Sequence, residues 1–222
     1  MRQGAAFAVL VAGLVLAIAW LFSTRPFQHR MATYTTDLEP RSPAQRLNIA
    51  EGARRLDGVV IEPGEELSFN AQIGPRTRER GFVSAAAFLE GNRVESVGGG
   101  ICQVSSTFYN AALLSGLEIR KRVPHDRVVN SVPPGADATV WYGKADLVIA
   151  NLTRQPVRIR ARVAGDRLTV GLDGPSQGSA YAVTSERTTL QDGRVRVRVF
   201  MTNRRQVETP RRELISDNTY RR

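Results

Sequence analysis

The sequence predicts a single α+β domain in which a helix with a cysteine in its first turn packs on a mainly antiparallel sheet. The chain of 222 residues is long enough for one domain with a full core plus appendages. After three glycines at 98–100, apolar residues recur every three to four positions up to Gly116, which is typical of a helix and its terminal glycine. Short apolar segments separated by turn residues fill most of the second half and are typical of antiparallel strands.

A targeting segment is predicted ahead of this domain. Residues 5–22 carry no charge and are apolar except for Gly13, and a short n-region at 1–4 precedes them. The segment is either an uncleaved single-pass anchor or a signal peptide cleaved at Ala17-Ile18-Ala19, with a buried core helix as the ordinary alternative. We therefore expect an extracytoplasmic domain, held at the cell membrane or released if the signal is cleaved.

Residues 23–45 predict a flexible tether, because they are polar, contain three prolines and show no lasting period. The main domain is expected over residues 46–175. Its first half predicts a short helix, two strands, a charged loop and a segment that is either a strand or a short helix, at 48–56, 59–61, 67–70, 74–82 and 85–90.

The second half predicts a series of extended segments after the cysteine helix, at 117–123, 128–132, 137–142, 147–150, 157–163 and 167–172. A turn-rich stretch at 173–179 ends the domain. Residues 176–222 then predict a basic hairpin, turned at 191–193, and a basic tail.

The net charge of +10 is uneven along the chain. Residues 151–222 hold 15 arginines against 7 acidic residues, a local charge of +8. Outside a membrane such a flank suits anionic lipid head groups or acidic wall polymers, and a solvated strand face is the ordinary alternative. No nucleic-acid partner is expected, because the targeting segment exports the chain and no basic-aromatic binding motif is present.

Cys102, the only cysteine, follows the three glycines directly and excludes an internal disulfide. In the first turn of a helix the positive end of the dipole lowers the pKa of a thiol, which favours a nucleophilic role. The glycines let the backbone approach a substrate, so we expect Gly99, Gly100 and Gln103 to contact substrate or oxyanion. A buried, inert cysteine is the alternative.

His125 is the only imidazole expected within the domain. A helix of about 13 residues rises roughly 20 Å, and a strand of about seven residues returns roughly 23 Å, which brings His125 level with Cys102. This order is analogous to papain-like and transglutaminase-like folds. The third, orienting residue is left open between Asp137 and Asp146, and a turn role is the alternative for Asp137.

Cofactor chemistry is not predicted. The chain has too few Cys and His residues for a metal site of that type, and its carboxylates show no spacing typical of a cation cage. The glycines lack the lysine of a phosphate-binding loop and any dinucleotide fingerprint. We therefore expect no metal and no cofactor.

Several motifs in sequence order resemble the VanW family over roughly residues 46–175. They are Pro63-Gly64-Glu65, Phe69-Asn70, Gly74-Pro75-Arg76-Thr77, Glu79-Arg80-Gly81-Phe82, Gly98-Gly99-Gly100-Ile101-Cys102-Gln103-Val104-Ser105-Ser106-Thr107, Tyr109-Asn110-Ala111-Ala112-Leu113, Arg122, Pro124-His125, Gly135-Ala136-Asp137-Ala138-Thr139-Val140 and Asp146-Leu147.

The family takes its name from vancomycin-resistance gene clusters and is associated with the bacterial cell envelope. The resemblance implies a cysteine L,D-transpeptidase that acts on peptidoglycan stem peptides, with Cys102 accepting the acyl group. Transpeptidation and hydrolysis stay open, because the choice depends on whether the pocket admits an amine and excludes water. The rival hypothesis is a non-catalytic envelope module that binds peptidoglycan or its precursor.

Overall fold

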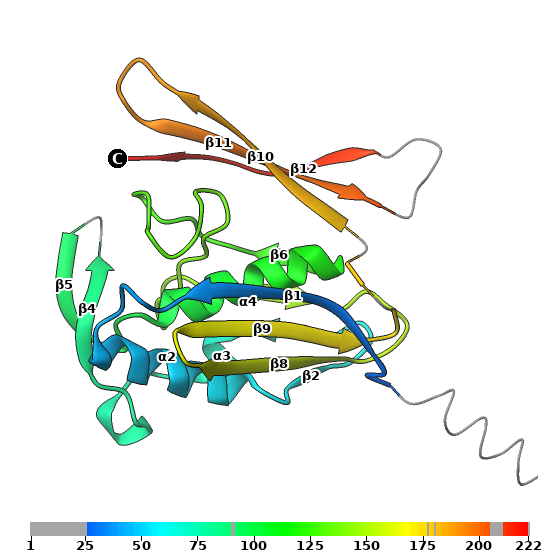
Figure 1. Cartoon of the computed structure of the whole chain (residues 1–222), viewed down its shortest axis with the longest axis horizontal. Coiled ribbons are helices and arrows are strands. Elements are labelled where there is room, and N and C mark those ends of the chain that lie inside the picture. The colour runs from blue at the N-terminus through cyan, green and yellow to red at the C-terminus, as the bar shows by residue number, and fades with distance from the viewer. Residues whose placement is uncertain (1–25, 90–91, 177, 180, 205–210, 222) are drawn as a thin grey trace, which may run out of the picture.

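The computed structural model describes residues 26–89, 92–176, 178–179, 181–204 and 211–221. Its largest sheet has four antiparallel strands in the order β1-β9-β8-β2. Helices α2 and α4 pack against this sheet and against each other (Figure 1). The predicted α+β class is therefore confirmed. These elements are β1 (His29–Asp37), α2 (Pro43–Leu56), β2 (Val60–Ile61), α4 (Ile101–Ser115), β8 (Val157–Ala164) and β9 (Arg167–Gly174).

Strand β1 corrects the prediction of a flexible tether over residues 23–45. It pairs antiparallel with β9 along its whole length, from His29 opposite Gly174 to Asp37 opposite Arg167. The ladder is irregular between Arg30 and Ala32, which breaks the alternation that would mark a strand in the sequence. Residues 29–37 are thus a structural part of the main sheet, and residues 23–25 lie outside the described residues.

Helix α2 begins five residues before the predicted start at 48. Ser42 caps it by accepting a hydrogen bond from the Gln45 N–H, and the Gln45 side chain accepts one from the Ser42 N–H. Pro43 occupies the first turn, where its fixed φ suits a helix. The prolines that suggested a tether therefore include a helix start signal.

Helix α4 is the centre of the molecule. It runs to Ser115, and Gly116 at φ 75° caps it, as the sequence predicts. Thirteen of its 15 residues are buried, so its polar side chains need partners inside the protein. Thr107, for example, shares a hydrogen bond of 2.9 Å with Thr36 of β1.

The segment that follows β6 differs most from the prediction. Residues 128–132 and 137–142 were expected as strands, yet neither forms one. Side chains of α4 take the place of a strand partner: Ser105 Oγ donates to the Ala138 carbonyl at 2.7 Å, and the Ala138 N–H donates to Ser106 Oγ at 2.9 Å. This pairing holds the segment along the first half of α4.

Smaller elements surround the start of α4. A hairpin of β4 and β5 resolves the ambiguity at 85–90 as a strand, and β3, β7 and β6 form a second antiparallel sheet. Of the predicted strand at 67–70, residues 67 and 68 form part of a strand. Residues 69 and 70 begin a helix instead, because Ser68 caps the Ala71 N–H. The bounds are β3 (Glu66–Ser68), α3 (Phe69–Ile73), the 3₁₀ turn η1 (Arg78–Arg80), β4 (Ser84–Leu89), β5 (Asn92–Val97), β6 (Glu118–Lys121) and β7 (Val148–Ala150).

The C-terminal region is a three-stranded antiparallel sheet of β10 (Tyr181–Thr189), β11 (Val195–Asn203) and β12 (Arg212–Tyr220). The predicted hairpin corresponds to β10 and β11, but the predicted tail contains a further strand. The buried side chains of Val197, Val199 and Tyr220 form a small core of their own. Figure 1 shows this sheet above the main domain, on the side of α4.

None of the helices in the described part of the chain has the length and apolar character needed to cross a membrane. The predicted targeting segment at 5–22 and its n-region at 1–4 lie outside the described residues.

Candidate active site

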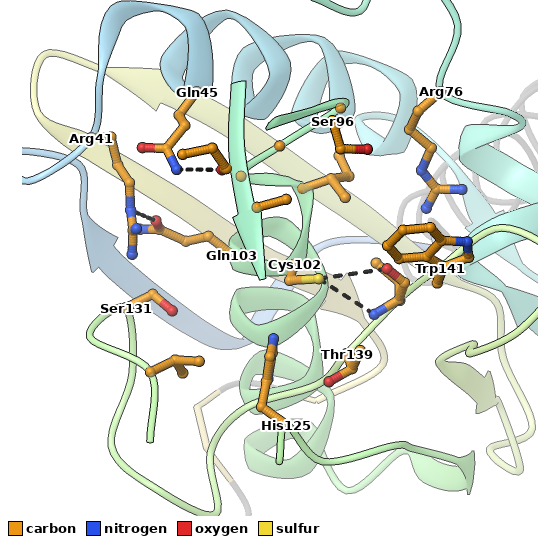
Figure 2. Close-up of a pocket in the computed structure, with 18 of the residues that line it drawn as sticks. Arg41, Gln45, Arg76, Ser96, Cys102, Gln103, His125, Ser131, Thr139 and Trp141 are labelled. Carbon is orange, nitrogen blue, oxygen red and sulfur yellow. Dashed lines mark hydrogen bonds between the residues drawn. The ribbon is translucent and has the colours of Figure 1, made fainter. Parts of the chain in front are cut away.

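Cys102 lies in the first turn of α4 and is half-buried. Its thiol donates to the Val140 carbonyl at 3.5 Å, and the Val140 N–H donates to the sulfur at 3.5 Å (Figure 2). The N–H contact favours the anionic form of the sulfur, because a backbone donor stabilises a thiolate.

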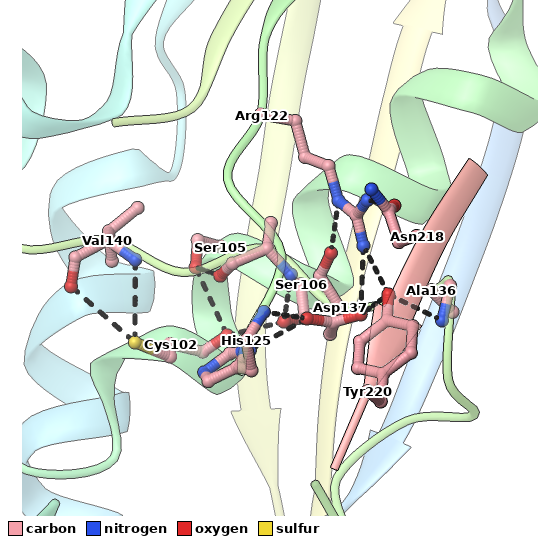
Figure 3. A network of polar contacts seen from close by, with 12 residues as sticks. Cys102, Ser105, Ser106, Arg122, His125, Ala136, Asp137, Val140, Asn218 and Tyr220 are labelled. Carbon is pink, nitrogen blue, oxygen red and sulfur yellow. Dashed lines mark hydrogen bonds and ion pairs between the residues drawn. The ribbon is translucent and has the colours of Figure 1, made fainter. Parts of the chain in front are cut away.

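His125 lies beside this thiol, in an irregular segment beyond β6 rather than on the predicted strand. Its ring Nδ1 is 2.8 Å from Asp137 Oδ2, and its backbone N–H donates to the same oxygen at 2.6 Å. With Nδ1 bound to the carboxylate, Nε2 is the ring atom left for Cys102. The structure thus brings together the three residues Cys102, His125 and Asp137 (Figure 3).

Asp137 is completely buried, and cationic and hydroxyl donors surround its carboxylate. Arg122 Nη2 donates to Oδ1 at 2.9 Å, and the Tyr220 hydroxyl donates to the same oxygen at 2.8 Å. Asp146, the other candidate, instead accepts hydrogen bonds from Ser68 Oγ at 2.5 Å and from the Asn70 N–H at 2.9 Å. Only Asp137 therefore reaches His125.

The three groups favour their charged forms. Burial alone would lower the pKa of His125, but its hydrogen bonds to Asp137 and Cys102 raise that pKa to about 9. Burial would likewise raise the pKa of Cys102, and interactions with His125, the Val140 backbone and Arg76 outweigh it, so the net shift is downward. Burial opposes ionisation of Asp137 too, yet His125 and Arg122 lower its pKa to about 2. These shifts favour a thiolate–imidazolium pair in which a carboxylate orients the imidazole.

A pocket of about 320 Å³ opens above the thiol. It lies between the β4–β5 hairpin, the glycine turn before α4 and the two loop stretches 128–131 and 139–142. Apolar and polar side chains both line it, among them Arg41, Gln45, Arg76, Val97, Ser131 and Trp141. The sulfur therefore faces a space large enough for part of a peptide.

The glycines before α4 allow close backbone packing beside this pocket. A Cβ on Gly99 would lie 2.3 Å from the Ala85 carbonyl oxygen. The Gly99 N–H donates to the Ser96 carbonyl at 3.1 Å. Gly100 takes the left-handed φ of 101° as the N-cap of α4. Both residues line the pocket, and the Gly99 N–H is engaged within the turn. Their contact with a substrate or oxyanion stays a prediction.

Gln103 differs from its predicted role as an oxyanion donor. Both N–H groups of its side-chain amide are used, by Thr36 Oγ1 at 3.0 Å and by the Asp37 carbonyl at 2.8 Å. Its Oε1 accepts from Arg41 Nε at 2.6 Å. The side chain therefore orients Arg41 at the edge of the pocket and has no N–H left for a substrate.

Two residues of the site were missed in the sequence. Tyr220 stands 83 positions after Asp137 in a region expected as tail, so no spacing could connect them. Arg122 appears among the family motifs, but only the fold shows that it holds Asp137, through the carbonyl at 2.7 Å as well as the carboxylate. The described residues contain no group of three or more His, Cys, Asp or Glu side chains placed to hold a metal ion.

The fold and the site define an α+β domain with a thiol, an imidazole and a carboxylate in line beneath a pocket. Comparison with known proteins identifies the family of this domain. The family described as "VanW like protein" matches residues 44–172, more than half of the chain. The chain belongs to the VanW family.

Two curated relatives agree with this membership. "Uncharacterized protein YoaR" of Bacillus subtilis (strain 168) is 41% identical over 143 residues, which cover 64% of this chain and 47% of that protein. "Vancomycin B-type resistance protein VanW" of Enterococcus faecalis (strain ATCC 700802 / V583) is 30% identical over 113 residues, 48% of this chain and 40% of that protein. The chain thus spans less than half the length of either relative. No solved structure matches it significantly.

Proposed function

We propose that this protein is a cysteine-dependent acyl transferase that acts on peptidoglycan stem peptides by an L,D-transpeptidase type of reaction. The proposal rests on the arrangement of Cys102, His125 and Asp137. Asp137 binds the His125 ring, His125 lies beside the Cys102 thiol, and the thiol lines the pocket. Family membership supports an envelope substrate, since a curated relative bears the name of a vancomycin-resistance protein.

In the first half of the reaction the Cys102 thiolate attacks the carbonyl carbon of an L,D-linked stem residue. A C–S bond forms and the carbonyl electron pair moves to oxygen. When the pair returns, the C–N bond breaks, and the His125 imidazolium gives its proton to the departing amine nitrogen. The product is a thioester on Cys102 and a free amine.

In the second half an amine of another stem peptide attacks the thioester. His125 takes a proton from that amine, a new amide forms and the C–S bond breaks, which regenerates the thiolate. Water in place of the amine gives hydrolysis. Asp137 keeps Nδ1 protonated throughout, so Nε2 always faces the sulfur.

The negative oxygen of the intermediate needs donors near the sulfur. The Val140 N–H, 3.5 Å from Sγ, and the backbone of the glycine turn are the nearest candidates. The roles follow the order known from papain-like cysteine peptidases, with a thiol at a helix start and an imidazole later in the chain. That likeness is one of pattern.

The envelope setting is part of the same proposal. Residues 5–22 would place the domain outside the cytoplasmic membrane, as a single-pass or released protein. The basic C-terminal region would contact anionic lipids or wall polymers. Several of its arginines pair with acidic neighbours, which reduces the charge available for such contacts: Arg194 with Asp192, Arg196 with Asp217, and Arg198 and Arg212 with Glu186.

A non-catalytic peptidoglycan-binding module is the second candidate. The observation in its favour is the half-buried thiol, whose S–H has an acceptor in the Val140 carbonyl. In that case the pocket would bind a stem peptide and Cys102 would remain unmodified.

Product analysis separates the two candidates. The full chain is incubated with purified muropeptides, and the products are resolved by mass spectrometry beside those of Cys102→Ala. Cross-linked dimers or shortened stems that require Cys102 support the enzyme. Identical profiles from both proteins, together with muropeptide binding by both, would establish the binding module.

A further inference from the structure

Two arginines line the pocket on opposite sides of Cys102, and neither forms an ion pair with an acidic side chain among the described residues (Figure 2). We propose that Arg76 and Arg41 are carboxylate-binding residues, and that the acyl substrate carries one carboxylate on each side of its reacting carbonyl. This inference rests on the proposed acyl transfer and adds the charge and the layout of the substrate.

Arg76 lines one side of the pocket and has a buried donor without an acceptor. Its Nη1 donates to the Gly74 carbonyl at 2.9 Å, whereas its Nη2 is buried and has no hydrogen-bond partner. A buried guanidinium N–H without an acceptor costs free energy, which an anionic ligand would recover. Burial lowers the pKa of this arginine, and the charges of Cys102, Asp146 and Tyr142 partly offset the shift, with Cys102 contributing most among the three.

The surroundings of Arg76 fix its position. Its guanidinium lies 5.7 Å from the ring centre of Phe69 and 6.0 Å from that of Tyr142. A Cβ on Gly98 would lie 2.7 Å from Cβ and Cγ of Arg76, so a glycine at this position leaves room for the arginine stem. The side chain is thus held at the pocket wall by packing rather than by an ion pair.

Arg41 lines the other side of the pocket. Its Nε donates to Gln103 Oε1 at 2.6 Å, and the Gln103 amide is fixed in turn by Thr36 and Asp37. This neutral partner orients the guanidinium without neutralising it. Burial lowers the pKa of Arg41, as expected for a cation partly removed from water.

The charge balance of the pocket points to an anionic ligand. The described residues that line it include no Asp or Glu, and the thiolate–imidazolium pair adds no net charge. Arg122, a buried arginine outside the pocket, is by contrast compensated by Asp137. Guanidinium groups bind carboxylates through paired N–H donors, so two arginines flanking a nucleophile suit a substrate with two carboxylates.

The first test measures alkylation of Cys102, in which a C–S bond forms and iodide leaves. Iodoacetate carries a carboxylate and iodoacetamide does not, so their rate ratio reports the field of the pocket. In the full chain we expect Arg76→Gln and Arg41→Gln each to lower the iodoacetate-to-iodoacetamide ratio roughly fivefold. Arg76→Lys should retain most of the ratio, and Arg78→Gln, which removes an exposed arginine outside the pocket, should leave it unchanged.

The second test counts the carboxylates. Three peptides compete with iodoacetamide for Cys102: succinyl-dialanine with two carboxylates, acetyl-dialanine with one, and acetyl-dialanine amide with none. We expect protection to fall in that order, and each arginine variant to remove one step of it. Equal protection by all three peptides, or an unchanged ratio in both Gln variants, would overturn the proposal.

These readouts do not depend on turnover. If muropeptides give no Cys102-dependent product while the peptide order holds, the acyl transferase fails and the carboxylate site stands. If products form but the three peptides protect equally, the enzyme stands and the carboxylate site fails.

Discussion

The chemistry of the single thiol depends on residues that approach it from three separate segments. Cys102 lies in the first turn of α4, His125 follows β6, and Asp137 lies on the stretch that side chains of α4 hold in place. Because Asp137 is buried and charged, the imidazole beside it favours its protonated form. The pKa of each group in the line therefore depends on the next one.

The first prediction concerns the pKa of Cys102. In the wild-type chain the alkylation rate with iodoacetamide should reach half its maximum below the ordinary cysteine pKa of about 8.5. In His125→Ala the midpoint should rise above that value, because burial still acts on the thiol after its main stabilising partner is removed. Stopped-flow alkylation between pH 5 and 10 measures both, and equal midpoints would refute the pairing.

The second prediction concerns stability in acid. The pKa of Asp137 is about 2 in the fold against an ordinary 3.8, so its stabilising contribution is complete above pH 3.8 and is lost as pH falls through 2. The shift corresponds to about 2 kcal/mol. Urea unfolding should show this loss between pH 4 and 2 in the wild type.

Asp137→Asn should lack that acid-dependent step and be less stable at neutral pH, whereas Asp166→Asn, at a more exposed ion pair, should retain it. An unchanged acid step in Asp137→Asn would assign the step to other carboxylates.

At the scale of elements, the glycine turn and the last strand position the site. The turn at 98–100 lets the start of α4 pass close to the β4 backbone, and β12 brings the Tyr220 hydroxyl to Asp137. That hydroxyl also accepts from the Gly135 N–H at 3.1 Å. An element outside the family match thus completes the hydrogen bonding of the carboxylate.

Gly99→Ala tests the packing of the turn. Its Cβ would meet backbone atoms of Ala85 and Ala86 at 2.3 to 2.7 Å, which cannot rotate away as a side chain would. We expect a loss of about 1–3 kcal/mol in the free energy of unfolding, measured by urea denaturation. Gly143→Ala, where a Cβ has open space, should cost only the backbone strain. Equal losses in the two variants would contradict a packing role.

Tyr220→Phe tests the contribution of β12. The change leaves the Gly135 N–H and one Arg122 donor without their acceptor, at a cost of about 1–3 kcal/mol. The alkylation midpoint of Cys102 should shift by less than in His125→Ala, since Asp137 keeps its bond to the ring. Tyr181→Phe is the matched control, and a midpoint that stays at the wild-type value in Tyr220→Phe would make the hydroxyl purely structural.

The sequence allowed α4, the strands β8 and β9 and the candidates Cys102 and His125 to be predicted, because period, terminal glycines and the scarcity of Cys and His are visible in the sequence. The choice between Asp137 and Asp146 needed the fold. Strand β1 was missed, since its partners in β9 are 130 to 145 positions away. Residues 128–132 and 137–142 were predicted as extended or strand segments from their apolar pattern, but Ala138 bonds to side chains of α4 and the Val128 N–H to the Arg221 carbonyl. Tyr220 was missed for the same reason as β1: only the fold brings it near.

At the scale of the whole molecule, the C-terminal sheet covers the main domain beside α4. Tyr181 packs its ring over Gly116, where a Cβ would lie 2.0 Å from it, and Val197 and Val199 pack over Gly135. The family match ends at residue 172, before this sheet begins. The protein therefore combines a family domain with an additional sheet that contacts its site.

Deletion of residues 176–222 should weaken both stability and reactivity. Removal of the Tyr220 bonds and of the packing on Gly116 and Gly135 should lower the melting temperature by roughly 10 °C and move the alkylation midpoint of Cys102 toward that of free cysteine. Differential scanning fluorimetry and iodoacetamide kinetics measure the two effects. A truncated chain with wild-type values of both would show that the sheet serves another purpose.

The acyl-enzyme itself is the most direct test of the central claim. The full chain is mixed briefly with purified muropeptides, quenched in acid and analysed by intact-protein and peptide mass spectrometry. The proposed mechanism predicts a covalent stem-peptide adduct on Cys102 that is absent in Cys102→Ala and strongly reduced in His125→Ala. No adduct on a thiol that still reacts with iodoacetamide would contradict it.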